Sequence, residues 1–248
     1  MTAPTFRDDL LTGRVALVAG GTGGIGAAIG DALAACGAVV TVTGATAAEA
    51  EAARSRPDFC GRDALALDVR DTAAIAALVA NLPRLDIVVN AAGVIRRDAE
   101  HDPAVFADVL DINLTGAMRL CTVARPLLAK SRGCIVNVTS MLAFFGGGRV
   151  PGYSASKGGL AQLTKSLAIA YAEDKIRVNA VAPGWIATAL TRALQDDHER
   201  SAAIVARTPL GRWGEPGDVA GTVVFLCSPA AEFVTGAIMP VDGGYLAA

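Results

Sequence analysis

The sequence of 248 residues has few aromatic and few charged residues, at 5% and 19%, against 52% hydrophobic residues. A chain so apolar and so long can bury an extensive core, which excludes intrinsic disorder. Its 22 basic and 24 acidic residues give a formal net charge of −2, and no stretch concentrates the basic residues. We therefore expect neither nucleic acid nor an anionic membrane surface as a partner.

The sequence also lacks a metal-ligand or disulfide pattern. Histidine occurs only twice, as His101 and His198. The cysteines are odd in number, scattered and without a C-x-x-C pair: Cys36, Cys60, Cys121, Cys134 and Cys227. We expect no metal site, and we interpret all five cysteines as small apolar fillers in a reducing cytoplasm. Residues 1–14 carry acids and no apolar segment, so neither a signal peptide nor a membrane anchor is expected.

Short β-branched runs alternate along the chain with longer Ala-rich segments of helical period. The runs lie at 15–19, 39–43, 64–69, 86–93, 134–140, 177–184 and 237–244. Strands that are apolar along their whole length predict a parallel sheet covered on both faces. Right-handed crossovers then favour an α/β fold with a doubly wound, Rossmann-like sheet of about seven strands. No repeat, linker or composition shift marks a boundary, so residues 1–248 are predicted to form one domain.

A glycine-rich turn follows the first predicted strand and leads directly into a helix. Gly20 permits a tight turn, Gly24 lets the backbone approach a pyrophosphate, and Gly26 permits close helix packing. The spacing G-x-x-x-G-x-G differs from the commoner G-x-G-x-x-G. Alone, it fits an ordinary glycine-rich loop as well as a dinucleotide site.

Further motifs follow the later strands, where the ligand site of a doubly wound sheet is expected. They are Asn90-Ala91-Ala92-Gly93, Ser140, the pair Tyr153 and Lys157 in Y-x-x-x-K, and Pro183-Gly184. With the glycine turn, this ordered set resembles the short-chain dehydrogenase/reductase family over essentially the whole chain. Two positions depart from the family pattern, because Ala19 replaces a Thr and Ala91 an Asn that usually make structural hydrogen bonds.

Tyr153 and Lys157 are four residues apart, which predicts that both side chains lie on one face of a helix. A phenol of pKa about 10 is a poor acid or base at neutral pH, and a nearby ammonium stabilises its phenolate. The resemblance implies that Tyr153 moves the proton to or from the substrate oxygen and that Lys157 also holds the nicotinamide ribose. Ser140 can bond the same oxygen, and Asn113 matches the family's fourth catalytic residue, which anchors a water leading to the lysine.

Each of these residues also has a structural interpretation. Ser140 could cap a turn, Tyr153 could lie in an interface, Lys157 could be a solvated charge, and Asn113 could bond locally. Their joint occurrence in order favours the catalytic interpretation.

The resemblance implies NAD(H) or NADP(H) as cofactor. The positions carried over as cofactor contacts are Gly20, Thr22, Gly23, Gly24, Ile25, Gly26, Gly44, Asp68, Val69, Asn90, Gly93, Tyr153, Lys157, Pro183, Gly184, Ile186 and Thr188. Asp68 and Val69 match adenine contacts, and Ile186 and Thr188 match residues that hold the carboxamide. Asp68 could equally be a helix cap before Asp71.

The sequence leaves the choice of dinucleotide open. The acid that normally bonds the ribose 2′-hydroxyl at the end of the second strand is replaced by Gly44, and no Arg or Lys stands there to bind a phosphate. Gly23 also fills a turn position that is often basic in relatives preferring NADP. We therefore expect weak selectivity, and the resemblance implies a modest preference for NAD(H).

Longer stretches resemble the sugar-acid branch of the family, at 94–97, 140–142, 146–151 and 211–214. This implies a small hydroxy or keto acid, such as a deoxy-keto-gluconate, in contact with Ser140, Met141, Arg149 and Tyr153. The candidate partners of its carboxylate are Arg96, Arg97, Arg149 and Arg212, although each could form an ordinary surface ion pair instead. Arg149 is favoured because it lies between the catalytic serine and tyrosine. Residues 187–206 depart most from the branch and are expected to cover the substrate.

Two other functions share this pattern: a 3-oxoacyl carrier-protein reductase, which needs a basic surface for its acidic carrier, and a non-catalytic binding protein on the same fold. The resemblance also implies a homotetramer. Its interfaces would use the helices around 103–130 and 153–172 and the C-terminal segment 241–248, which are rich in Ala, Leu and Gly.

Overall fold

The computed structural model describes residues 5–57, 59 and 62–248, and its strands there form one parallel sheet in the order β3-β2-β1-β4-β5-β6-β7. Their bounds are β1 (Val15–Ala19), β2 (Val39–Gly44), β3 (Arg62–Ala66), β4 (Ile87–Asn90), β5 (Cys134–Val138), β6 (Arg177–Pro183) and β7 (Ile238–Val241). The order reverses at β1, which pairs with β2 on one side and β4 on the other. The predicted doubly wound α/β fold is confirmed.

Several strands end earlier than their apolar runs predict. The run at 86–93 forms a strand only to Asn90, opposite Ala19, because the neighbouring strand β1 ends there. The run at 64–69 pairs only to Ala66, opposite Gly44 at the end of β2. Strand length is therefore set by the neighbouring strand, and the residues beyond each end, Asp68 among them, are free to turn toward a ligand site.

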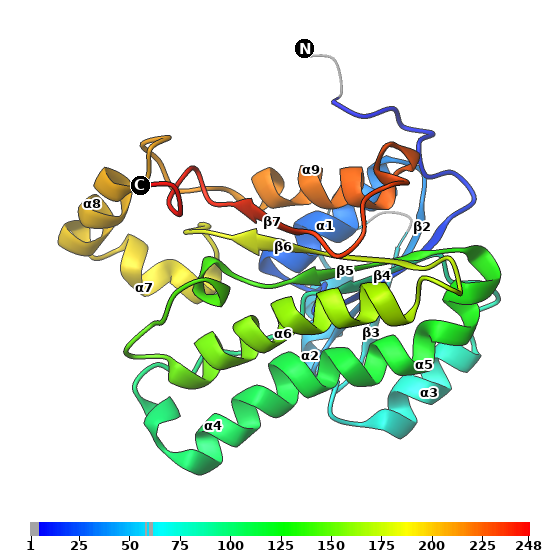
Figure 1. The fold of residues 1–248 in the computed structure, drawn as a ribbon, viewed down its shortest axis with the longest axis horizontal. Coiled ribbons are helices and arrows are strands. Elements are labelled where there is room, and N and C mark those ends of the chain that lie inside the picture. Colours follow the sequence, from blue (N-terminus) through cyan, green and yellow to red (C-terminus); the bar gives the residue numbers. More distant parts are fainter. Residues whose placement is uncertain (1–4, 58, 60–61) are drawn as a thin grey trace.

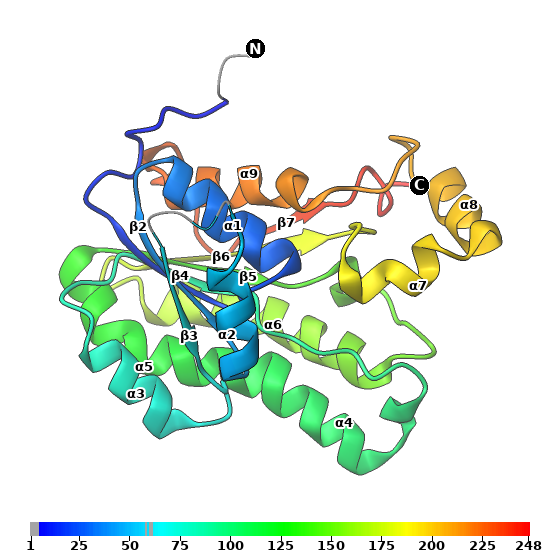
Figure 2. The same cartoon turned by 180° about the vertical axis from the view of Figure 1, so that it is seen from behind.

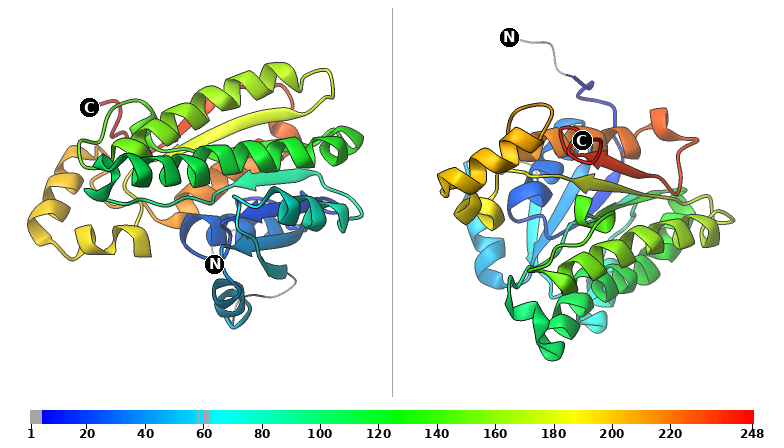
Figure 3. Two further views of the ribbon diagram at one scale, coloured as in Figure 1. Left: turned by 90° about the horizontal axis from the view of Figure 1, so that it is seen from below. Right: turned by 60° about the vertical axis from the view of Figure 1, so that its left-hand side comes forward.

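Helices cover both faces of the sheet (Figures 1 and 2). The larger helices are α1 (Gly24–Ala35), α2 (Ala47–Arg54), α3 (Thr72–Ala80), α4 (Pro103–Leu110), α5 (Gly116–Ser131), α6 (Pro151–Ala170), α7 (Arg192–Gln195), α8 (His198–Arg207) and α9 (Pro216–Cys227). Helices α1 and α9 lie together on one face; on the other, α4 and α5 follow one another end to end and run beside α6 (Figure 3). The segment 187–206, expected as a substrate cover, contains α7 and α8 and projects beyond one end of the sheet.

The core has two parts, one on each face of the sheet. Along β1, Ala16 and Val18 join the cluster beneath α1 and α9, whereas Leu17 and Ala19 join the cluster beneath α5. Successive strand residues point to opposite faces, so a strand buried on both sides must be apolar at every position. This explains the uninterrupted apolar runs in the sequence.

Polar side chains cap the starts of several helices, among them α3 and α4. Asp71 caps α3 by accepting a hydrogen bond from the amide of Ala74 at 2.9 Å, so the interpretation of Asp68 as this cap is wrong. Asp102 caps α4, and Pro103 occupies its first position. Between α4 and α5 the chain forms one π-helical turn, Asp111–Thr115, and Asn113 lies in it. Such turns are rare and are frequent at functional sites.

The described residues contain no helix long and apolar enough to cross a membrane. They also contain no group of three or more His, Cys, Asp or Glu side chains placed to hold a metal ion. Cys36, Cys121, Cys134 and Cys227 are buried and free, as fillers would be. Cys60 lies outside the described residues.

Candidate active site

A cavity of about 500 Å³ lies at the C-terminal ends of the strands. That size and position suit a ligand site of a doubly wound sheet. The predicted residues that line it are Gly20, Thr22, Gly23, Gly24, Ile25, Gly26, Gly44, Asp68, Val69, Gly93, Ser140, Tyr153, Lys157, Pro183, Gly184, Ile186 and Thr188. Residues from the glycine turn to the segment after β6, far apart in the chain, are therefore brought to one site.

The glycine turn has the backbone conformation and close contacts that its composition suggests. Gly20 has φ +74°, and a Cβ there would lie 2.5 Å from the backbone of Ala92. A Cβ on Gly26 would lie 2.1 Å from the carbonyl oxygen of Gly20. Gly23 faces open space, and α1 begins beside it without an acidic residue in its first turn. This cradle of small residues at a helix N-terminus fits the pyrophosphate of a dinucleotide.

Asn113 holds the loop that follows β4. Its amide group accepts a hydrogen bond from the backbone N–H of Val94 at 2.8 Å and donates one to the carbonyl of Val94 at 2.9 Å. It also donates to the hydroxyl of Ser156 in α6 at 3.1 Å. Asn113 is 1% exposed and does not itself line the cavity, so its visible contribution is to fix Val94, which does.

Lys157 is buried, with its ammonium group donating to the carbonyl of Val138 at 2.8 Å. Burial lowers the pKa of Lys157 to about 8. Its Nζ atom lies 5.5 Å from the ring centroid of Tyr153, so the two side chains share one face of α6 as their spacing predicts. A Cβ on Gly93 would lie 3.5 Å from this Nζ, and the absence of a side chain there leaves the ammonium open to the cavity.

Tyr153 and Ser140 meet at the cavity wall. Burial raises the pKa of Tyr153 to about 12, the hydrogen bond with Ser140 opposes this rise, and the negative charge of Glu100 adds to it. The lowering by the Lys157 ammonium that the sequence predicts is not among the causes of this shift in the pKa of Tyr153. Ser140 ends the segment after β5 and caps a short 3₁₀ turn, accepting from the amide of Leu142 at 3.2 Å. A pKa raised in this way favours the neutral phenol.

Four predicted site residues lie outside the cavity lining: Asn90, Asn113, Met141 and Arg149. Asn90 donates to Asn137 at 2.8 Å and to the sulfur of Cys121 at 3.3 Å, so its side chain braces β4 against β5 and α5. Met141 is 3% exposed. Neither side chain lines the cavity.

Arg149 also lies outside the lining and is engaged by an acid. Both carboxylate oxygens of Asp98 accept hydrogen bonds from the Arg149 guanidinium, and this ion pair is exposed. Arg212 is held the same way by Asp218, at 2.7 and 2.9 Å. Arg96 and Arg97 are exposed in the loop after β4. The guanidinium of Arg96 forms a loose ion pair with the carboxylate of Asp108, at 4.0 Å. For Arg149 and Arg212 the surface ion pair is thus the arrangement found.

Two further acids, Glu100 and Glu49, lie at the site and are not among the residues predicted from the sequence. Glu100 is 1% exposed and accepts the backbone amide of Tyr153. Nothing in the run of charges at 96–102 distinguishes it, because its burial depends on α6. Glu49 lines the cavity beside Gly44. The sequence does contain a pattern that indicates this position of Glu49, because Thr46-x-x-Glu49 is a helix-start pattern whose glutamate folds back toward the preceding strand.

Comparisons with known proteins agree with this site. The family model described as "Enoyl-(Acyl carrier protein) reductase" matches residues 19–246. The chain belongs to the short-chain dehydrogenase/reductase family, a class of NAD(P)-dependent oxidoreductases.

Its relatives include named dehydrogenases of sugar acids. A 2-dehydro-3-deoxy-D-gluconate 5-dehydrogenase of Pseudoalteromonas atlantica is 42% identical, over 95% of this chain and 97% of that protein. The Bacillus subtilis protein of the same name is 41% identical, over 95% of this chain and 96% of its own length. A crystal structure of a gluconate 5-dehydrogenase from Burkholderia cenocepacia J2315, in complex with NADP and tartrate, is similar with a TM-score of 0.90 at 33% identity, covering 97% of this chain and 98% of that one.

Proposed function

We propose that the protein interconverts a secondary alcohol and a ketone on a sugar acid of the deoxy-keto-gluconate class, using NAD(H) or NADP(H). The observation that carries the proposal is the meeting of Ser140, Tyr153 and Lys157 on one wall of the cavity that begins at the glycine turn. The names of the similar proteins support the substrate class. The chemistry supplied by a bound dinucleotide is hydride transfer.

The residues of this chain handle the proton and the oxygen. During reduction, the hydroxyl of Tyr153 donates its proton to the substrate oxygen, and Ser140 donates a hydrogen bond to the same atom. The ammonium of Lys157 stabilises the phenolate that remains. In the oxidation direction Tyr153 accepts the proton instead, so its raised pKa makes oxidation faster at high pH.

We assign the substrate carboxylate to Arg96 among the candidate arginines. The guanidinium groups of Arg149 and Arg212 each bind an acid through two short hydrogen bonds, whereas the ion pair of the Arg96 guanidinium with Asp108 is 4.0 Å long. Arg96 also follows closely on Val94, which lines the cavity. A guanidinium that is loosely paired is the one best able to take up a substrate carboxylate.

A substrate panel tests the proposal. The purified protein is assayed for reduction or oxidation of both dinucleotides with sugar acids, their neutral polyol analogues and a 3-oxoacyl thioester. Turnover of a sugar acid that exceeds turnover of the thioester supports the proposal. The reverse preference identifies a carrier-protein reductase, and no turnover with any compound identifies a binding protein.

We further propose that the single domain of residues 1–248 assembles as a homotetramer in the cytoplasm. Exposed apolar side chains on the outer face of the helix layer support assembly, with Met118 on α5 37% exposed and Ile169 on α6 79% exposed. Free buried cysteines suit a reducing compartment. Light scattering on the purified protein measures the assembly, and a monomer at micromolar concentration would contradict it.

A further inference from the structure

Gly44 stands at the end of β2 where an acid normally bonds the ribose, and the carboxylate of Glu49 lies beside it. A Cβ added to Gly44 would lie 2.9 Å from the Oε2 atom of Glu49, 2.8 Å from its Cβ and 2.7 Å from the hydroxyl of Thr22. All three residues line the cavity. The carboxylate of Glu49 therefore occupies the space that a side chain at position 44 would fill.

This carboxylate is held in place by the start of α2. Thr46 caps the helix by accepting the amide of Glu49 at 3.2 Å, and Oε2 of Glu49 accepts the amide of Ala45 at 2.9 Å. The side chain is thus turned back toward the end of β2 and away from solvent-facing α2 neighbours such as Glu51, which pairs with Arg54. A carboxylate oxygen accepts several hydrogen bonds, so a ribose hydroxyl can bind the same group.

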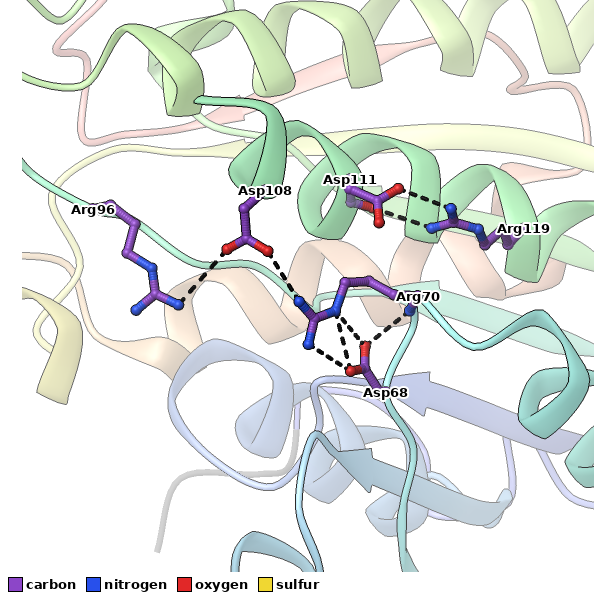
Figure 4. A network of polar contacts seen from close by, with 6 residues as sticks. All are labelled: Asp68, Arg70, Arg96, Asp108, Asp111 and Arg119. Carbon is purple, nitrogen blue, oxygen red and sulfur yellow. Dashed lines mark hydrogen bonds and ion pairs between the residues drawn. The ribbon is translucent and has the colours of Figure 1, made fainter. Parts of the chain in front are cut away.

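The neighbouring cation, Arg70, is already paired with two carboxylates. Arg70 also lines the cavity, but its guanidinium bonds both oxygens of Asp68 and one oxygen of Asp108 at 2.9 Å (Figure 4). Asp108 in turn faces Arg96 (Figure 4). The β2 side of the cavity therefore presents Glu49 and Asp68 against one engaged arginine, a poor setting for an added phosphate.

We propose that Glu49 is the specificity-determining residue that makes this cavity favour NAD(H) over NADP(H). An acid at this place accepts a hydrogen bond from the ribose 2′-hydroxyl, whereas it repels a 2′-phosphate of roughly −1.5 to −2 charge. The weak selectivity predicted from Gly44 is then replaced by a clear preference for NAD(H). The inference rests on the proposed function only in requiring that the cavity bind a dinucleotide, and it is independent of the substrate.

Because a relative was crystallised with NADP, the dinucleotide cannot be assigned by similarity and must be measured on this chain. Calorimetric titration of the full-length protein with NAD⁺ and with NADP⁺, without substrate, gives the two dissociation constants directly. We expect wild type to bind NAD⁺ about tenfold more tightly or better, the size of one well-placed charge interaction. Glu49→Gln keeps the size and the acceptor for the amide of Ala45 but removes the charge, so NADP⁺ should bind about tenfold more tightly than to wild type.

Glu51→Gln is the matched control, because it removes a charge of the same sign from the same helix at a side chain paired with Arg54. Its two dissociation constants should equal those of wild type. Since exposed charges are screened by salt, the preference of wild type for NAD⁺ should also shrink between about 0.05 and 0.5 M salt, and Glu49→Gln should lose that dependence.

Three results would overturn the inference: equal affinity of wild type for both dinucleotides, a preference for NADP⁺, or an unchanged preference in Glu49→Gln. Glu49→Lys is a second test, because it should reverse the preference if the site is at the 2′ position. A protein that binds neither dinucleotide refutes the proposed function itself. A protein that binds NAD⁺ selectively but oxidises no sugar acid refutes the substrate and leaves the role of Glu49 standing.

Discussion

The buried carboxylate of Glu100 accepts a hydrogen bond from the backbone amide of Tyr153, with an oxygen–nitrogen distance of 2.7 Å. Its other oxygen accepts the amide of Arg96, also at 2.7 Å. One side chain thus joins the first turn of α6, which carries Tyr153, to the loop after β4. A carboxylate suits this place because the amides and the dipole at a helix N-terminus favour negative charge.

Glu100→Gln should therefore change both the position and the acidity of Tyr153. Burial is the main cause of the raised pKa of Tyr153, and the charge of Glu100 adds to it, so neutralising Glu100 lowers that pKa. Oxidation needs the phenolate, so the rise of kcat with pH should move to lower pH. The lost acceptor should also reduce kcat by about tenfold, as expected for a misplaced catalytic group.

The control for this variant is Asp102→Asn, which removes an exposed charge two residues away and retains the cap of α4. Its pH profile should match that of wild type. A lower kcat in Glu100→Gln with no movement of the profile would reduce Glu100 to a purely structural role.

Tyr153→Phe should leave dinucleotide binding nearly intact, because only the hydroxyl is lost. Turnover should fall by about 10²- to 10⁴-fold, the usual contribution of general acid catalysis. Steady-state assays measure the loss, and calorimetric titration with the dinucleotide shows that the site still forms. Retention of more than about a tenth of wild-type turnover is incompatible with a role as proton donor.

Lys157 makes stability depend on pH in a direction that follows from its pKa of about 8. Between about pH 8 and 10.5 the unfolded chain still binds the proton and the folded protein has released it, so the free energy of unfolding rises with pH. Below that window the buried ammonium costs roughly 3 kcal/mol. Lys157→Met should flatten this rise in urea titrations across the window, while abolishing turnover. An unchanged slope would show that the ammonium is not desolvated.

Arg96→Ala and Arg149→Ala separate the two candidate partners of the substrate carboxylate. Loss of a bidentate charge-assisted contact should raise KM for the sugar acid by about tenfold or more in Arg96→Ala, with little effect on a neutral polyol. Arg149→Ala removes an exposed ion pair and should leave both KM values close to wild type. A larger effect in Arg149→Ala would return the carboxylate contact to the position that the sequence favours.

The fold and the central pair of the site follow from local pattern. Fully apolar strand runs require a sheet buried on both faces, and the spacing of Tyr153 and Lys157 puts them on one face of a helix wherever that helix packs. The glycine turn is likewise recognisable, because only residues without a Cβ tolerate the approach of Ala92 to Gly20. The strand runs and the spacing of Tyr153 and Lys157 depend on neighbours in the chain, and the glycine turn shows in its composition although Ala92 is distant in sequence, so composition and spacing are enough to predict these features.

The remaining features depend on which distant segments meet. Glu100 is buried and accepts a hydrogen bond from the backbone of Tyr153 in α6, and Arg149 forms an ion pair with Asp98 outside the cavity. Both contacts join residues about 50 positions apart. Glu49 is a nearer case: the Thr46-x-x-Glu49 pattern marks the helix start, and the structure shows that its carboxylate lies in the space beside Gly44. A charged side chain acquires its role from the partner that desolvates or neutralises it, and that partner is set by packing between elements rather than by periodicity along the chain.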